Sequence, residues 1–351
     1  MDSQIQSKRK IQQLGSSTLG VTIPKEWIDQ QNLTKGDQIL IQEDEITGSI
    51  LVVPVDQTVH NRSVTINIDT LTPTELTQVI VSQYILCRQT INIQSSQRIT
   101  AEQYKSITQI EEQLIGVGII EDQSTHLTLR CSVSAKEFNL SRLIERIHQT
   151  EARMRTDALT GLLEDDMEAR HRVKDRCGRT ESLFFLFLRL LFTAYRNPKL
   201  NKSIGLDTGF PLMGYRSVVQ DLVLMGDVNQ QIALLAEDAR CLPLDDNTST
   251  LVSDIGIPLE ETIEATIDGI TKAEFRSTNK AAHQLTGVRE AIETFNTYLD
   301  GVRPEPLLIL QRISMLLDRH SVLTEDIIEA AMRLSLRSES NFLSEVSMDP
   351  C

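Results

Sequence analysis

The segment 9–27 constrains the fold more strongly than any other part of the chain. It joins a basic cluster, a polar loop between two glycines at 15–20, an apolar run and a proline, Pro24, that can begin a helix. A Lys35-Gly36-Asp37 turn and an alternating strand over 38–41 follow. This order predicts strand, loop, strand, short helix, turn and strand. A module of that size is too small to bury a core of its own, and its positive loop could meet phosphate groups.

The charge of the whole chain limits how it can bind nucleic acid. Its 351 residues carry 35 basic and 49 acidic side chains, a formal net charge of −14. Because such a field repels nucleic acid, any contact with DNA must come from a local basic patch. Residues 1–35 hold five basic and three acidic side chains, a local charge of +2. The opening segment is therefore the candidate patch.

The cysteines and the apolar runs argue against several classes of protein. Five cysteines are scattered without a CxxC pair, which argues against a disulfide framework and a zinc site. The most apolar run, Leu183–Tyr195, is interrupted by Arg189 and is shorter than the roughly twenty apolar residues that a bilayer span needs. The N-terminus has no apolar signal region. We therefore expect a cytoplasmic protein without a membrane span, long enough for two or three domains.

Three zones with different periodicity predict a multidomain α+β protein. Residues 7–54 read as short strands and turns, with Thr47-Gly48 as a hairpin turn. Residues 63–132 predict a β-α-β-α-β-β module whose two helices cover one face of its sheet. Thr72 and Thr100 are expected to cap those helices.

The third zone, residues 136–340, has helical period throughout and predicts an all-α bundle of antiparallel helices. Whether its segment 257–300 forms one helix or two stays open, because Gly269 and Gly287 each weaken a continuous helix. The expected helices span 136–156, 158–196, 212–242, 257–300 and 304–337.

The polar loop and its flanking cations are the candidate contacts for DNA. Hydroxyls and closely spaced backbone N–H groups can donate to phosphate oxygens, and basic side chains neutralise their charge. A lone basic triplet is more often a solvated tail, but the order of the surrounding elements favours a functional loop. The loop is not a nucleotide-binding P-loop, because Val21 stands where that motif needs a lysine. The candidate residues are Lys8, Arg9, Lys10, Ser16, Ser17, Thr18 and Lys25.

The run from Arg9 to Pro54 resembles the swapped-hairpin domains of the AbrB/SpoVT/MazE family. The matching elements are the basic start, the glycine loop, the Val21–Lys25 run, Leu33 and the turn at 35–37. The resemblance implies that two chains interleave their hairpins into one β-barrel, which removes exposed sheet edges, and that the basic loops bind DNA. Bacterial members usually carry arginines where this loop has serine and threonine, so fewer bidentate contacts with bases are expected. A second copy of the chain and DNA are thus the expected partners.

Acidic residues at helical spacing are the candidate metal ligands. Carboxylates four residues apart share a helix face and can hold a metal together. In an acidic protein such residues more often form a solvated face. The candidates are Glu164, Asp165, Asp166, Glu168, Asp175, Glu181, Asp227, Glu237 and Asp238.

The helical half resembles PhoU proteins over Ala158–Tyr195 and Tyr215–Ala236. PhoU proteins are paired three-helix bundles in which E/D-x-x-x-D motifs hold metal clusters. The corresponding positions here read Cys177 to Glu181 and Val223 to Asp227, so each pair lacks its first carboxylate. Thiol and isopropyl groups are poor substitutes for hard oxygen ligands. The resemblance therefore implies a PhoU-like bundle with no required cofactor, and a metal ion would have only the degenerate motif residues Glu181 and Asp227.

The order of an AbrB-like domain, an α/β module and a PhoU-like bundle resembles archaeal phosphate uptake regulators. This resemblance implies a regulator of phosphate uptake that acts through DNA, with a phosphate transporter's ATPase or a sensor kinase as a further partner. The alternative is a dimeric scaffold that binds no DNA and regulates such a transporter or kinase by protein contact. An enzyme is the least favoured class, because no nucleophile–base pair, metal cage or cofactor motif emerges. A toxin gene beside this one would indicate an antitoxin instead.

Overall fold

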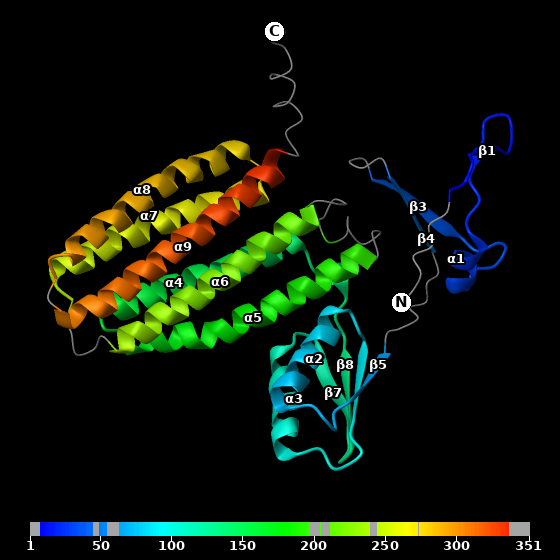
Figure 1. The fold of residues 1–351 in the computed structure, drawn as a ribbon, viewed down its shortest axis with the longest axis horizontal. Helices are drawn as coiled ribbons and strands as arrows, with labels where there is room; N and C mark the ends of the chain where they lie inside the picture. The colour runs from blue at the N-terminus through cyan, green and yellow to red at the C-terminus, as the bar shows by residue number, and fades with distance from the viewer. Residues whose placement is uncertain are drawn as a thin grey trace, which may run out of the picture. The chain divides into compact units, whose positions relative to one another are not determined.

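The chain forms two units that divide between Arg62 and Ser63, and each unit is described by itself. The computed structural model describes residues 8–44, 49–54, 63–196, 204, 211–238, 244–272, 274–302 and 304–336. Short strands make up the first unit, and a small sheet followed by long helices makes up the second (Figure 1). The multidomain α+β class expected from the sequence is confirmed.

The first unit consists of two small hairpins and a short helix. Strand β1 (Gln12–Gln13) pairs antiparallel with β2 (Leu19–Gly20), and β3 (Ile39–Asp44) pairs antiparallel with β4 (Ser49–Pro54). Helix α1 (Lys25–Gln30) begins directly after a proline, whose fixed φ suits a helix start. The hairpin turn expected at Thr47-Gly48 lies outside the described residues.

Local hydrogen bonds form the turn between α1 and β3. The Asp37 carboxylate accepts from the backbone N–H of Thr34 at 2.6 Å and from the Thr34 hydroxyl at 3.1 Å. Gly36 has a φ of +109°, which other residues adopt only with strain. The turn expected at Lys35-Gly36-Asp37 is therefore confirmed, and glycine is required at its centre.

The second unit begins with a four-stranded sheet and two helices. Its strands lie in the order β5-β6-β8-β7, with β5 parallel to β6 and the other neighbours antiparallel. This is the expected β-α-β-α-β-β order along the chain. The elements are β5 (Ser63–Asn67), α2 (Pro73–Ile85), β6 (Thr90–Gln94), α3 (Ala101–Gln113), β7 (Val117–Asp122) and β8 (His126–Cys131).

Both helices pack against one face of this sheet (Figure 1). The opposite face is polar, since the Thr128 hydroxyl there donates to Asn92 Oδ1 at 3.2 Å. Thr72 and Thr100 cap α2 and α3 through reciprocal hydrogen bonds with the third residue of each helix, as their sequence positions predicted. The buried side chains between sheet and helices include Ile91, Ile93, Leu127 and Leu129 from the strands, Leu76, Ile80 and Tyr84 from α2, and Ile107 and Ile110 from α3.

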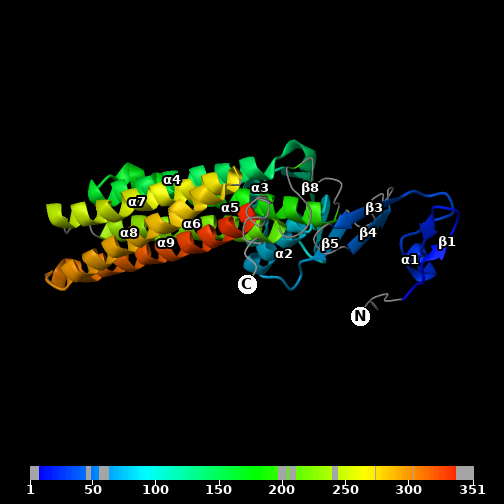
Figure 2. The ribbon, with the colours of Figure 1, turned by 90° about the horizontal axis from the view of Figure 1, so that it is seen from above.

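Six long helices follow and lie side by side in both views (Figures 1 and 2). Helices α4, α5 and α6 pack together as one three-helix group, α7, α8 and α9 pack as another, and α6 packs along α9 between the groups. A single apolar core runs through both groups. None of the helices in the described part of the chain is long and apolar enough to cross a lipid bilayer. The six are α4 (Leu140–Leu163), α5 (Met167–Arg196), α6 (Pro211–Asp238), α7 (Asp246–Thr271), α8 (Phe275–Leu299) and α9 (Pro304–Leu336).

Two expected helix boundaries were wrong. The break expected near 157 lies at 164–166, where Asp165 takes a left-handed φ of +53° and the Asp166 carboxylate accepts from the N–H groups at the start of α5. The segment 257–300 is two helices, and the first begins much earlier, after the capping side chain of Asp245. Gly269 lies inside α7, where a Cβ would collide with Thr278 of α8. This glycine therefore permits a close approach of two helices.

Arg189, which interrupts the most apolar run of the sequence, joins the sheet module to α5. Its side chain is buried and donates to the backbone carbonyls of Tyr84 and Arg88, at the end of α2 and just beyond it. Its guanidinium also lies 4.8 Å from the centre of the Tyr84 ring. A cation in this place donates to carbonyls at the C-terminal end of a helix, where the helix dipole favours positive charge; the Tyr84 carbonyl also accepts from the backbone N–H of Cys87 at 3.0 Å. One arginine thus fastens the sheet module to the bundle.

Replacing Arg189 with methionine should destabilise the second unit. Methionine keeps much of the side-chain volume but leaves both carbonyls without these donors, which costs about 2–4 kcal/mol of unfolding free energy. Arg189→Lys, which keeps the charge and loses the paired geometry, should lie between wild type and Arg189→Met. Urea denaturation followed by circular dichroism measures all three. Equal midpoints for wild type and Arg189→Met would show that the contact contributes nothing.

Candidate nucleic-acid interface and buried charge cluster

The glycine loop connects the two shortest strands of the first unit. Gln12 pairs with Gly20, Gln13 pairs with Leu19, and the backbone N–H of Leu14 donates to the Thr18 carbonyl at 2.9 Å to close the loop. A Cβ at Gly20 would collide with the Leu14 side chain, so the glycine lets the apolar side chain lie across the strand pair. The loop therefore has a defined hairpin geometry.

All the candidate DNA contacts are exposed in this structure. Ser16, Ser17 and Thr18 form the tip of the hairpin loop, the basic triplet Lys8–Lys10 directly precedes β1, and Lys25 is the first residue of α1. Within the described residues, none of these four cations forms an ion pair. Their charge is thus open to a ligand from solution. Contact of these residues with DNA stays a prediction.

The same unit leaves six large apolar side chains exposed to water. Neither of the two apolar cores found among the described residues includes a residue of this unit. Such a set of side chains on one small unit is unusual, because large exposed apolar surfaces normally mark an interaction site. The exposed fractions are 72% for Ile11, 71% for Leu14, 67% for Leu19, 62% for Val21, 62% for Ile41 and 66% for Ile50.

The two degenerate motif residues lie on neighbouring helices near Cys177. Burial raises the pKa of the Cys177 thiol, and the carboxylates of Asp227 and Glu181 raise it further. Glu181, however, accepts a hydrogen bond from the side chain of Gln113 at 2.5 Å. Within the described ranges, no group of three or more His, Cys, Asp or Glu side chains is arranged to hold a metal. These residues therefore show no site built around a metal.

A buried charge cluster, which the sequence analysis missed, lies where the two three-helix groups meet. The Glu151 carboxylate, on α4, is fully buried and accepts from Arg155 Nη1 at 3.1 Å through both oxygens. Asn229 Nδ2 from α6 donates to it at 3.0 Å, and His320 Nε2 from α9 lies 3.3 Å away. The signal in the sequence was a charged pair, Glu151 and Arg155, four residues apart on the apolar face of the expected helix.

The pKa values of Glu151 and His148 are both lowered in this cluster. Burial alone would raise the pKa of Glu151, but the charge of Arg155 and the contact with His320 outweigh it and lower the pKa to about 2. Burial lowers the pKa of His148, one turn earlier on α4, although the Glu151 charge opposes the change. Glu151 is therefore a buried, ionised carboxylate, and its stability contribution depends on its partners.

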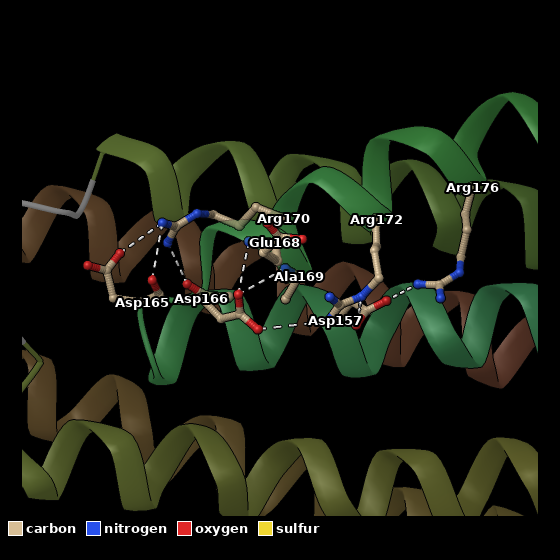
Figure 3. Close-up of polar contacts among 9 residues, drawn as sticks. Asp157, Asp165, Asp166, Glu168, Ala169, Arg170, Arg172 and Arg176 are labelled. Atoms are coloured by element: carbon tan, nitrogen blue, oxygen red, sulfur yellow. Dashed lines mark hydrogen bonds and ion pairs between the residues drawn. The ribbon is translucent and has the colours of Figure 1, made fainter.

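Aspartates at the junction of α4 and α5 accept hydrogen bonds from arginines, so they are not free to act as metal ligands (Figure 3). The buried Arg170 donates to the Gly161 carbonyl at 2.7 Å and to Asp165 Oδ1 at 2.9 Å. Arg172 and Arg176 both donate to Asp157. Acidic residues that suggested metal ligands are thus part of the packing of two helices.

The first unit matches a known family. Residues 12–59 match the family described as antidote-toxin recognition MazE, bacterial antitoxin, and this segment is about one seventh of the chain. A comparison with curated proteins found no match. The swapped-hairpin resemblance is therefore confirmed at the level of the N-terminal domain, which is of a kind that fits a dimeric DNA-binding regulator. The resemblance of the helical half to PhoU proteins stays a prediction.

Glu151→Gln should destabilise the bundle at neutral pH. The change leaves Arg155 as a buried charge without its carboxylate, which costs about 3–5 kcal/mol. Because the folded pKa of Glu151, about 2, lies below its ordinary value of 4.5, the carboxylate stabilises the fold above pH 4.5 and loses that effect as the pH falls toward 2.

The stability difference between wild type and Glu151→Gln should accordingly narrow as the pH falls from 5 to 3. Urea denaturation at several pH values measures it. Glu261→Gln, at an exposed position on α7, is the matched control and should change little at any pH. A difference that stays constant with pH would contradict the assignment of an ionised Glu151.

Proposed function

With residues 12–59 taken as a MazE-type domain, we propose that the chain is a homodimeric DNA-binding regulator. The observation that carries this proposal is the set of six exposed apolar side chains on a unit that has no core of its own among the described residues. Burying a valine, leucine or isoleucine side chain contributes about 1.5–3 kcal/mol. A second copy that interleaves its hairpins with these would bury them and would also cover the edges of the two-stranded sheets.

The polar loop gives this dimer a surface for DNA. Two copies would present two loops and two basic triplets, and a two-fold dimer places such elements symmetrically. The loop supplies hydroxyls and N–H groups for phosphate oxygens, whereas Arg9 is the one arginine among the candidates. This composition favours phosphate contacts over the reading of bases. A regulator of this kind acts in the cytoplasm, and the proposal includes no catalytic activity and no required cofactor.

The proposal has a second, more specific part: the helical half senses the phosphate supply of the cell and transmits that signal to the DNA-binding unit. Two three-helix groups agree with the paired bundles that the PhoU resemblance implies. A phosphate transporter's ATPase or a sensor kinase would then be the protein partner. Deletion of the gene should change phosphate-dependent expression and uptake; unchanged expression and uptake would remove this part of the proposal while leaving the DNA-binding dimer intact.

The second candidate function, a scaffold that works through protein contact alone, is favoured by a groove between α6 and α9. Leu234 and Met315 in this groove are 54% and 71% exposed. Exposed apolar side chains beside a polar rim are typical of protein interfaces. The two functions differ in whether the full-length protein binds DNA. The groove residues are Gln231, Leu234, Leu235, Arg312, Met315 and Leu316.

Val21→Asp or Ile41→Asp should dissociate the dimer. Each introduces a charge where the proposed interface is apolar, and an unpaired buried charge costs several kcal/mol. Sedimentation velocity of the full-length protein should show a shift from dimer to monomer. Gln38→Asp, at an exposed polar position in the same unit, makes a comparable charge change and should leave the dimer intact. A wild-type monomer at micromolar concentration would refute the proposed dimer.

Replacing Lys8, Arg9 and Lys10 with glutamine should weaken DNA binding and reduce its dependence on salt. Each phosphate contact that is lost lowers the slope of log K against log salt concentration by about 0.9. Fluorescence anisotropy with a labelled duplex between 50 and 200 mM salt measures the slope. Lys105→Gln, an exposed cation on α3, controls for the change of charge. No binding by wild type even at low salt would support the scaffold instead.

A further inference from the structure

A second basic surface lies on the helical half, along the outer side of α4 and α5. Asp157 of α4 is its centre: Arg172 donates to Asp157 Oδ1 through Nε at 3.0 Å and Nη2 at 2.8 Å, and Arg176 Nη1 donates to Oδ2 (Figure 3). One carboxylate therefore serves two guanidinium groups. Asp166 is the next acidic group and lies 3.8 Å from Arg172 Nη2.

Two more arginines lie on the same side without a carboxylate. Arg153 is four residues before Asp157 on α4, and Arg179 is three residues after Arg176 on α5, so each shares a helix face with a member of the pair. Both are exposed, and neither forms an ion pair with any residue that the structure describes. Burial lowers the pKa of Arg176, and the charges of Arg153 and Arg179 lower it further, which agrees with three neighbouring cations.

We call Arg146, Arg153, Arg172, Arg176 and Arg179 the arginine seam. Arg146 belongs to it because it is exposed and lies seven residues, or two helical turns, before Arg153. Two carboxylates, Asp157 and Asp166, form ion pairs with this set, and the exposed Glu168 and Asp175 lie on the same face of α5. Five guanidinium groups thus lie beside four carboxylates, in a chain whose formal net charge is −14. Arg170 is not part of the seam, since its side chain is buried between α4 and α5 and donates to the Gly161 carbonyl. The seam is a locally positive surface on an acidic protein.

The composition of the seam points to a polyanion rather than to a protein surface. Protein interfaces have an apolar or aromatic centre, but none of the exposed large apolar side chains found in the described residues lies between 142 and 160 or between 170 and 182. Arginine binds phosphate through two parallel hydrogen bonds. A row of exposed guanidinium groups along two helices fits successive phosphates of an extended chain better than one small anion.

We propose that the arginine seam contacts the phosphate backbone of the DNA that the full-length protein binds. This inference rests on the proposed DNA-binding function. The seam offsets the repulsion that an acidic helical half exerts on a duplex, and it adds affinity without reading sequence.

The test is a salt titration of DNA binding with the full-length double variant Arg153→Gln/Arg179→Gln. These two residues are exposed and their replacement leaves the Asp157 contacts in place, so the fold is retained, as circular dichroism checks. The slope of log K against log salt concentration should become shallower by about 1.8, so the loss of affinity from 50 to 200 mM salt should be about tenfold smaller than for wild type. Affinity at 50 mM salt should itself fall about tenfold or more.

The matched control is Arg289→Gln/Arg333→Gln, which removes two exposed arginines that pair with Glu325 and Glu329 on the other three-helix group. Its slope should equal that of wild type. An equal loss in both double variants would overturn the inference, because net charge alone would then explain it. Wild-type binding with an unchanged slope in the seam variant would also overturn it and would leave the proposed function standing.

Two further outcomes separate the remaining explanations. Absence of DNA binding by wild type would refute the proposed function, and the seam contact with it. A seam variant that binds DNA normally but changes its self-association in sedimentation velocity would overturn the DNA contact and assign the seam to the acidic surface of a second copy.

Discussion

The buried carboxylate of Glu151 is the contact that the helical half depends on. Removing a charge from water costs several kcal/mol unless partners replace the water, and here the partners come from α4, α6 and α9. They lie within 3.3 Å of the carboxylate, whereas one helical turn is about 5.4 Å. A slip of α9 by one turn would therefore remove His320 from the carboxylate and leave it with Arg155 and Asn229 alone. Apolar contacts between leucine and isoleucine discriminate less between such arrangements.

The cluster also connects the two three-helix groups. Glu151 belongs to the first group and His320 to the second. A relay between distant sites requires an element that has two arrangements with similar free energies. In the proposed relay, the Glu151–His320 contact is the candidate for such an element, because it crosses between the groups, whereas the Glu151–Arg155 ion pair lies within α4.

Local signals predicted much of the fold, and contacts between distant residues were the part that sequence could not provide. The capping residues Thr72 and Thr100 act within three positions of themselves, and both were found from the sequence. The break at 164–166 was missed because it contains neither glycine nor proline, and an aspartate takes the left-handed conformation there. Asn229 lies 78 residues from Glu151, so no local pattern pairs them.

At the candidate site, too, the sequence predicted local features but not contacts between distant residues. The order of loop, strand and turn identified the N-terminal domain, and the exposed positions of Lys8, Arg9 and Lys10 agree with a surface role. The arginine seam was not found, since it arises only when two packed helices bring Arg153 and Asp157 of α4 beside Arg172 and Arg176 of α5. Among the acidic residues proposed as metal ligands, Asp165 and Asp166 contact arginines, and Glu181 accepts a hydrogen bond from the Gln113 amide.

In the proposed dimer, the absence of a core among the described residues of the first unit would make the amount of active protein depend steeply on synthesis. A chain without its partner leaves Ile11, Leu14 and Val21 in water, and unpaired units of this kind are open to proteolysis. Below the dissociation constant, the concentration of a dimer rises with the square of the concentration of its chains, so halving synthesis lowers the dimer about fourfold. Occupancy of a binding site then responds to gene dosage more sharply than it would for a monomeric regulator.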